Sequence, residues 1–429
     1  MLPECRKEGY LYTIPACHIT TPDVEAFVTE LKEFHGKFAT CFVRSEPREN
    51  FYQYMVGQLS QLERKSIEPI AIHVSGKEHV RSMQRLVSEA VWDESTMLST
   101  YQDMVAEEMG ESDGVLTFDE SGFVKKGTMS AGVARQYCGT IGKVENCQVG
   151  VFMGYASRQG YALVEARLFF PEAWCEKSFA AKRRACGVPE DLSFKTKPQL
   201  AADMLLTCYQ QGRLPFTYIV ADSLYGNSPE FLEAAEQCVG KTYLVSMPAT
   251  TQCWRSRPAT TTKTYRYTGE VRTKRILKLT KNTPITFEQF AADQHACRWV
   301  TRTVSEGTKG PITYEFTRRQ VTLAKDGLPW KRLWLLVKRT RGDNPRYWYY
   351  VSNASRHARL KLFVWLSGVR WAIEQCFEDT KGEVGMDQYE VRKYAGWRRH
   401  LLTCFLAHFL CGISSSRWQI VPPASPCRN

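Results

Sequence analysis

The chain has 429 residues, of which 43% are hydrophobic and 24% are charged, and its formal net charge is +12. This composition is that of an ordinary globular protein, and it excludes disordered and fibrous chains. The length is sufficient for two or three domains.

The positive charge is concentrated in one part of the chain. Residues 251–347 contain 21 Lys and Arg but only 7 Asp and Glu, a net charge of +14, whereas the rest of the chain is close to neutral. A concentrated basic surface releases counterions when it binds phosphates, so we expect this segment to contact nucleic acid. A solvated basic face without a partner is the alternative.

The cysteines and the apolar stretches indicate where the protein resides. The 15 cysteines include no C-x-x-C pair, which argues against a zinc ribbon and a disulfide framework and favours small core residues in a reducing cytoplasm. The start, MLPECRKEGYLYTIP, lacks the apolar region of a signal peptide. The longest apolar stretch, LLTCFLAHFLCGI, is too short to span a bilayer and contains His408, so we predict a buried helix there.

The first part of the chain is predicted to be helical. TPDVEAFVTELKEFHGKF begins with Thr21 and Pro22, a good N-cap and first-turn pair, and VRSMQRLVSEAVWDESTMLSTYQDMVAEEM has apolar residues at helical spacing. We assign residues 1–110 to an N-terminal helical domain, for which we expect a role in DNA binding.

Residues 111–248 are predicted to alternate between strands and helices. GVLTFDE is a short strand that ends at Asp119, and a glycine-rich basic loop follows it. QVGVFMGYAS and GYALVEARLFF form a hairpin, and then come the helix KPQLAADMLLTCYQQG, the apolar strand FTYIVAD, the helix PEFLEAAEQCV and the strand KTYLVSMP. The order β-β-β-α-β-α-β predicts an α/β fold with a mixed sheet covered by helices.

The pattern changes twice more before the end of the chain. Residues 249–352 alternate Thr, aromatic and basic side chains, which predicts an all-β insertion that coincides with the basic segment. Three of its tryptophans, Trp299, Trp330 and Trp334, either grip unstacked bases or belong to the core. Residues 353–429 return to helical periodicity.

Two aspartates follow apolar strands. Asp119 and Asp222 each end a predicted strand and precede a loop that contains glycine. Strand ends hold a side chain rigidly while its tip stays in a cleft. Two such carboxylates on neighbouring strands would repel each other unless a cation lay between them, and hard divalent ions prefer these oxygens. The alternative is that each aspartate caps a turn.

A third acid lies on the helix after the insertion. At 100° per residue, Arg370, Glu374, Glu378 and Lys381 fall on one narrow stripe beside an apolar arc. The stripe is therefore expected at the border of the packed face, where a cleft would lie. The alternative is an exposed ladder of salt bridges.

These residues and motifs together resemble the DDE transposases of bacterial insertion sequences. The similarity is carried by LSQLERKSIEPIA, FDESGFVKKG, GVARQYCGTIGKVENCQV, ADSLYG, RWAIEQCFEDTK and MDQYEVRKYAGWRRH, and it spans about residues 45–410. It implies an RNase H-like mixed-sheet catalytic core in two parts, residues 111–248 and 353–429, interrupted by the all-β insertion. The spacing of Arg370, Glu374 and Lys381 resembles the Tyr-Arg-Glu-Lys signature of this group, except that Ser367 stands where the signature has Tyr.

The resemblance also assigns roles to individual residues. Asp119, Asp222 and Glu374 become the metal ligands, Asp119 bridging two Mg²⁺ ions for which Mn²⁺ would substitute, and Arg370 and Lys381 become their catalytic companions. Lys125, Lys126, Arg135 and Lys143, together with Arg370 and Lys381, are expected to contact DNA.

The implied activity is cleavage of DNA at the ends of the element followed by strand transfer into target DNA. The expected partners are the terminal inverted repeats and the target DNA, bound by a homodimer, without a membrane, and the expected location is the bacterial cytoplasm at the nucleoid. Two alternatives stay open: an RNase H-like endonuclease without strand transfer, and a domesticated DNA-binding protein.

Overall fold

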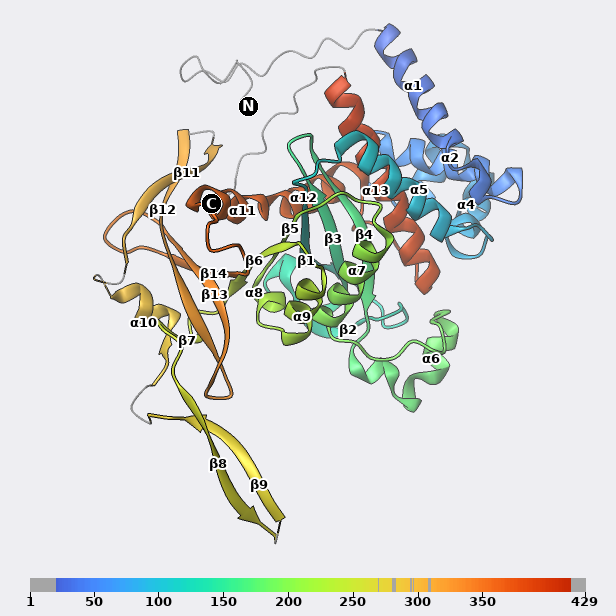
Figure 1. Ribbon diagram of the computed structural model, residues 1–429. Coiled ribbons are helices and arrows are strands. Elements are labelled where there is room, and N and C mark those ends of the chain that lie inside the picture. Colours follow the sequence, from blue (N-terminus) through green and yellow to red (C-terminus); the bar gives the residue numbers. More distant parts are fainter. Residues whose placement is uncertain are drawn as a thin grey trace. The chain divides into compact units, whose positions relative to one another are not determined.

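The computed structural model describes residues 21–268, 270–279, 283–293, 295, 297–307 and 310–417. The chain divides into two compact units (Figure 1). The first unit combines the chain up to Phe216 with the chain from Trp371 onward, and the second unit is Thr217–Arg370.

An antiparallel sheet forms the centre of the first unit. Its strands are β1 (Val115–Val124), β2 (Ala134–Cys138), β3 (Lys143–Ala156) and β4 (Tyr161–Phe169). The long strand β3 pairs with each of the other three. Ten consecutive residues of β3, Cys147–Ala156, pair with the whole of β1, so the register of β1 is fixed along its length.

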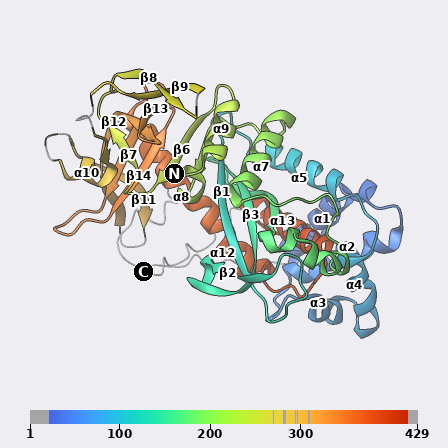
Figure 2. The same ribbon diagram turned by 90° about the horizontal axis from the view of Figure 1, so that it is seen from below.

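Helices cover both faces of this sheet (Figures 1 and 2). The helices are α1 (Thr21–Gly36), α2 (Ser45–Leu59), α3 (Ile67–Val74), α4 (Val80–Ser88), α5 (Glu94–Met109), α6 (Ala180–Ala185), α7 (Lys197–Gln211), α12 (Trp371–Val384) and α13 (Tyr394–Arg417). α7 contacts β3 and β4, and α12 contacts β1, β3 and β4. The long helix α13 contacts β4, α12 and four of the N-terminal helices, so it ties the N-terminal helices to the sheet.

The second unit contains a mixed sheet. Its elements are β5 (Tyr218–Ala221), α8 (Ser223–Gly226), α9 (Pro229–Gln237), β6 (Thr242–Met247), β7 (Gln252–Trp254), β10 (Ile285–Thr286), α10 (Phe287–Ala292), β11 (Val300–Gly307), β12 (Gly310–Lys325), β13 (Leu328–Arg339), β14 (Tyr347–Ser352) and α11 (Leu360–Val369). β5 and β6 are parallel, and β6 continues through β14 and β13 to β12 in antiparallel pairs. Two further strands, β8 (Thr260–Tyr267) and β9 (Glu270–Leu277), form a separate ribbon.

The predicted α/β class with a mixed sheet and helices is confirmed. The hairpin of β3 and β4 and the final buried helix also appear where the sequence predicted them. The segment 249–352, predicted to be all-β, contains the short helix α10, which begins with a capping box formed by Thr286 and Gln289. None of the helices in the described part of the chain has the length and apolar character needed to cross a bilayer.

The prediction that the first strand ends at Asp119 is wrong. β1 continues to Val124, so Asp119 lies in the middle of the strand. Gly122 lies in the segment predicted to be a glycine-rich loop, but a Cβ atom at this position would overlap Sγ of Cys138. The glycine therefore allows close packing within the sheet and does not end the strand.

A buried polar cluster joins α2, α13 and the segment between α12 and α13. The ring of His400 is fully buried, with Nδ1 lying 2.8 Å from the Tyr54 hydroxyl and Nε2 lying 3.1 Å from the Met386 carbonyl oxygen. The Met386 carbonyl can only accept a hydrogen bond, so Nε2 carries the hydrogen and donates it, and Nδ1 accepts the hydrogen bond that the Tyr54 hydroxyl donates. Burial lowers the pKa of His400 to about 4, against the opposing effect of the Met386 hydrogen bond.

We expect the first unit to lose stability in mild acid because of His400. Between its ordinary value of 6.5 and about 4, the unfolded chain binds a proton that the folded chain does not, so the unfolding free energy falls as the pH falls, by at most about 1.4 kcal/mol per pH unit. Urea unfolding of the wild type and of His400→Gln at pH 6.5 and pH 4.5 measures how much unfolding free energy each protein loses between these two pH values. The variant should be less stable at pH 6.5 but lose less stability on acidification; an equal loss in both proteins would contradict the assignment.

Candidate active site

Asp119 lies on the face of the sheet that α12 covers. It is half-buried on β1, and its register partner on β3 is Phe152. The ring of Phe152 packs on the ring of Phe377 of α12, with centroids 5.0 Å apart. Residues paired across antiparallel strands point to the same face, so Asp119 projects toward α12. Its Oδ1 accepts the backbone amide of Glu120 at 2.8 Å.

Glu120 projects to the opposite face, as expected on an extended strand. Its carboxylate forms an ion pair with Lys197, the first residue of α7, at 3.1 Å. The two neighbouring acids of β1 therefore have different environments. Asp119 lies on the α12 side, and Glu120 attaches the start of α7 to the sheet.

The helix α12 lies along β1 with Glu374 at its border. A Cβ atom on Gly154, the register partner of Thr117, would lie 3.4 Å from Cγ1 of Ile373. Ile373 and Phe377 therefore both lie on this face of the sheet, Ile373 near Gly154 and Phe377 on Phe152, the register partner of Asp119. Glu374 is the exposed residue between them in the sequence, about 60° around the helix from Phe377. The structure therefore places Asp119 and the helix turn of Glu374 on the same face of the sheet.

Lys381 continues this border toward the far end of β1. Its ammonium group donates to Oγ1 of Thr140 at 3.2 Å and lies 5.6 Å from the centre of the Phe123 ring. Burial lowers the pKa of Lys381, and the charge of Asp387 opposes this effect. A phosphate near this lysine would stabilise its charged form. Lysines with perturbed pKa values are frequent at functional sites.

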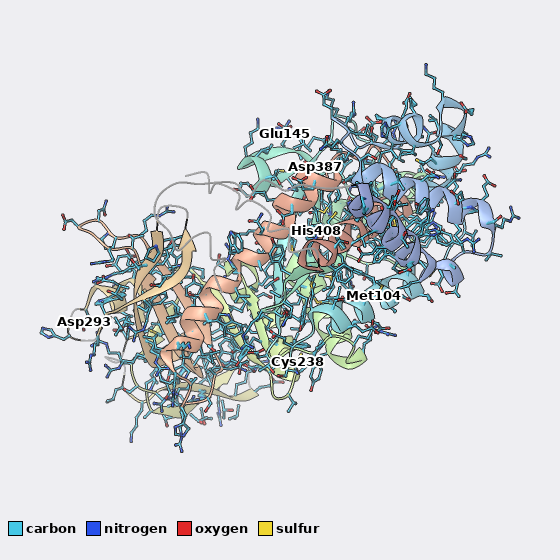
Figure 3. All side chains as sticks on the ribbon, turned by 90° about the horizontal axis from the view of Figure 1, so that it is seen from above. Met104, Glu145, Cys238, Asp293, Asp387 and His408 are labelled. Carbon is cyan, nitrogen blue, oxygen red and sulfur yellow. The ribbon has the colours of Figure 1, made fainter. Side chains whose placement is uncertain are left out.

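A polar network on the other side of α12 holds the helix in place. Asp379 accepts hydrogen bonds from Gln375 at 2.6 Å and from the Tyr161 hydroxyl at 3.0 Å, and Nε2 of His408 lies 3.6 Å from it. These partners belong to α12 itself, β4 and α13 (Figure 3 labels His408). Despite its burial, Asp379 has a pKa below its usual value because of these bonds. The network fixes α12 from the side opposite to Glu374 and was not predicted from the sequence.

Asp222 directly follows β5 in the second unit. Its Oδ1 accepts the backbone amides of Leu224 at 2.9 Å and Tyr225 at 3.4 Å, so it caps the short helix α8. The capping alternative from the sequence therefore describes its local structure. The predicted triad is divided between the units, with Asp119 and Glu374 in the first and Asp222 in the second.

Arg370 lies at a boundary. The sequence placed it on one helix with Glu374 and Lys381, but α11 ends at Val369 and α12 begins at Trp371. The division between the two units falls at the same place. Ser367, which stands at the position of the signature Tyr, is buried and donates to the Val364 carbonyl at 2.8 Å.

The four basic residues predicted to contact DNA near Asp119 have different environments. Lys126, Arg135 and Lys143 are exposed around the β2–β3 hairpin. The ammonium group of Lys125 instead donates to the Tyr389 carbonyl at 2.8 Å and lies 3.3 Å from the centre of that ring. Burial lowers the pKa of Lys125 to about 7. Lys125 thus makes internal contacts that the sequence did not reveal.

Three tryptophans of the second unit, Trp299, Trp330 and Trp334, are half-buried, and each carries a basic side chain over its ring. The charged groups lie 3.9 Å to 4.7 Å from the ring centres, with Arg339 over Trp299, Lys331 over Trp330 and Arg318 over Trp334. Such pairs place positive charge beside an aromatic surface.

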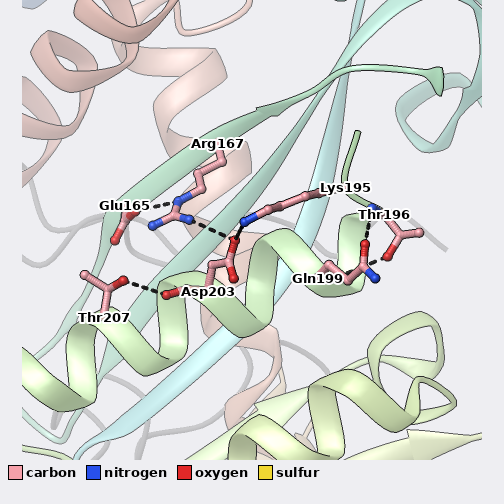
Figure 4. A network of polar contacts seen from close by, with 7 residues as sticks. All are labelled: Glu165, Arg167, Lys195, Thr196, Gln199, Asp203 and Thr207. Carbon is pink, nitrogen blue, oxygen red and sulfur yellow. Dashed lines mark hydrogen bonds and ion pairs between the residues drawn. The ribbon is translucent and has the colours of Figure 1, made fainter. Parts of the chain in front are cut away.

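A cavity of about 500 Å³ lies along β4 in the first unit, where α7, α13 and residues 189–195 meet. Its charged lining includes Glu165, Arg167, Lys195 and Asp203, which form one network (Figure 4). Asp203 joins Lys195 at 2.6 Å and Arg167 at 3.5 Å. Burial raises the pKa of Glu165, although Arg167 opposes this effect. The predicted site residues are not part of this lining, and the network serves to attach α7 to β4.

The donor chemistry of the predicted triad fits a hard divalent ion, because all three side chains offer carboxylate oxygens. Within the part of the chain that the structure describes, no three acidic, histidine or cysteine side chains are grouped closely enough to hold a metal ion. Metal binding by the triad therefore stays a prediction.

Comparison with known proteins gives three findings. The model of the family described as DDE superfamily endonuclease matches residues 37–311, a stretch that includes Asp119 and Asp222 but ends before Glu374. A curated protein of Microchaete diplosiphon, named "Probable transposase for insertion sequence element IS701", is 22% identical over 353 residues, which cover 81% of this chain and 77% of that protein. The crystal structure of the NurA nuclease from Sulfolobus solfataricus matches 77% of this chain and 94% of that chain at 10% sequence identity, and its TM-score of 0.26 is too low to establish a common fold.

Proposed function

Because the chain belongs to the family of DDE superfamily endonucleases, we propose that it is an insertion-sequence transposase that cuts DNA at the ends of its element and joins the freed ends to target DNA. Family membership makes the protein a DNA-processing enzyme. The name of the Microchaete relative supports the more specific function. Transfer of two ends to one target would require two copies of the chain, so we include a homodimer in the proposal.

An RNase H-like core is part of this proposal. Along the chain, the antiparallel strands β1, β3 and β4 are followed by α7, β5, α9 and β6, which is the element order expected of that core. The segment with β7–β14 follows β6 and precedes α12, so it has the position of an insertion before the helix that carries Glu374.

Asp119, Asp222 and Glu374 are the residues that we assign to metal binding. Two divalent ions, when bound, would activate the attacking water or 3′-hydroxyl and stabilise the leaving 3′-oxygen. The observation that carries the assignment is that Asp119 faces the α12 side of its sheet, together with the turn that bears Glu374. The rigid strand pairing of β1 and the anchored helix α12 would keep the two carboxylates in place.

Basic side chains around these acids would position the DNA. Lys381 offers a point charge at the border of α12, and Arg370 offers a planar fork that matches a phosphate. The exposed residues Lys126, Arg135 and Lys143 would contact the backbone of the DNA that passes β1, while Lys125 would support this surface from inside. The signature Tyr is replaced by the buried Ser367, so the proposal includes no hairpin step that depends on that Tyr.

One assay separates the proposed function from its two alternatives. Purified protein is mixed with DNA that carries the element's terminal repeat, a target plasmid and Mg²⁺ or Mn²⁺. A transposase yields joined products, and we expect this result. Cleavage without joining would indicate an endonuclease, and a mobility shift without either product would indicate a DNA-binding protein that has lost catalysis.

A further inference from the structure

The ribbon formed by β8 and β9 is an exposed basic arm of the second unit (Figure 1). Thirteen of its sixteen strand residues are exposed, so it contributes little to a core of its own. A two-stranded hairpin is marginally stable in water unless something packs on it. The strands carry five Lys and Arg residues and one acid, Glu270. An exposed arm with this charge is built to contact a polyanion.

The pairing of the two strands distributes its side chains unequally between two faces. One face, which we call the lysine face, bears the pairs Lys263–Lys274, Tyr265–Arg272 and Tyr267–Glu270. The other, the arginine face, bears Arg266 and Arg275 among threonines and a valine. Arg275 donates to Oγ1 of Thr260 at 3.0 Å, so part of its hydrogen-bonding capacity is used within the ribbon.

The lysine face carries a repulsive pair at its centre. Lys263 and Lys274 are direct cross-strand partners, and like charges in this position destabilise a sheet. Toward the turn, Arg272 lies over the ring of Tyr267, 5.2 Å from its centre, and forms an ion pair with Glu270 at 3.0 Å. Glu270 and Tyr267 thereby hold the guanidinium group, whereas the two lysines would gain most from a phosphate between or beside them.

The geometry points to duplex DNA as the partner of this ribbon, with the lysine face on the phosphate backbone along the major groove. Eight residues per strand give a length of roughly 26 Å, and the major groove, about 12 Å wide, admits a two-stranded ribbon. The inference rests on the proposed function, which supplies DNA as the substrate, and it names the element that grips that DNA outside the catalytic residues. An anionic membrane would offer the same charge, but a narrow twisted ribbon matches a groove better than a plane.

Two double variants with the same change in charge test the inference. Lys263→Gln/Lys274→Gln alters the lysine face, and Arg266→Gln/Arg275→Gln is the matched control on the arginine face. The affinity of the full-length protein for terminal-repeat duplex is measured by fluorescence anisotropy at several salt concentrations without divalent ions. We expect the slope of log K against log[salt] to become shallower by about 1.8 in the lysine-face variant, which corresponds to two lost phosphate contacts. The control should change it little.

Equal losses in the two variants would overturn the assignment of the lysine face, and an unchanged slope in both would overturn the contact with DNA. If the lysine-face variant lost binding to phosphatidylserine vesicles while keeping its DNA slope, the partner would be a lipid surface and the inference would fail. A parallel cleavage assay of the wild type keeps the two proposals apart. If the wild type cuts and joins DNA but neither variant changes the slope, the proposed function holds and the contact between the ribbon and DNA is overturned. If the lysine-face variant changes the slope as expected but the wild type never cuts DNA, the contact holds and the proposed function is overturned.

Discussion

Asp222→Asn is expected to abolish DNA cleavage while leaving the binding of the element's ends intact. The amide oxygen of asparagine can still accept the hydrogen bonds that the backbone amides of Leu224 and Tyr225 donate to Asp222. Asn is also as good an N-cap residue as Asp. What the variant loses is the negative charge that we assign to metal binding. We expect the rate of strand cleavage to fall by at least about 10³-fold, or about 4 kcal/mol of transition-state stabilisation.

The control for Asp222→Asn is Glu230→Gln in the first turn of α9. It removes the same charge from the same unit, where Glu230 accepts the Ser228 hydroxyl at 2.7 Å. Glu230→Gln should cleave at close to the wild-type rate, and both variants should bind end DNA in a mobility-shift assay. Cleavage by Asp222→Asn at the wild-type rate would remove Asp222 from the site, and loss of end binding would show that the residue acts through folding.

The class of the fold was predictable because the chain alternates between two clear periodicities. The strands β3, β4 and β5 are apolar and bounded by turns, and α13 is a long apolar helix. The end of β1 was not predictable in the same way. Ser121 and Gly122 are residues typical of turns, but ten residues of β3 are available to pair with β1, and this tertiary pairing overrides the local preference.

The environment of single charged residues was the least predictable part of the site. The sequence shows Lys125 beside Lys126 in a basic segment, but only the fold brings Lys125 under Tyr389, 264 residues further along the chain. The helix periodicity likewise placed Arg370 on one stripe with Glu374, although the helix is interrupted at Arg370. By contrast, the opposite directions of Asp119 and Glu120 follow from strand geometry alone, and Glu120 pairs with Lys197 on the other face.

Glu374→Gln is expected to abolish cleavage, and Glu378→Gln is expected to leave it nearly unchanged. Both glutamates are exposed on α12, one turn apart, so the sequence alone distinguishes them weakly. The packing of the helix separates them. Phe377 marks the side of α12 that faces Asp119, and Glu374 lies about 60° from it around the helix whereas Glu378 lies about 100° from it. Lys381, about 40° from Phe377, reaches Thr140 and Phe123 on this same side.

The two variants form a matched pair because each removes one exposed carboxylate from the same helix. Cleavage of end DNA should fall by at least about 10³-fold in Glu374→Gln and by less than a factor of a few in Glu378→Gln, with equal thermal unfolding midpoints. The reverse result would assign the third metal ligand to Glu378, one turn further along α12. Wild-type activity in both variants would mean that α12 supplies no metal ligand. Asp379, the remaining acid on the middle of the helix, would not take this role, because it is already bound to Gln375 and Tyr161 on the opposite side of α12.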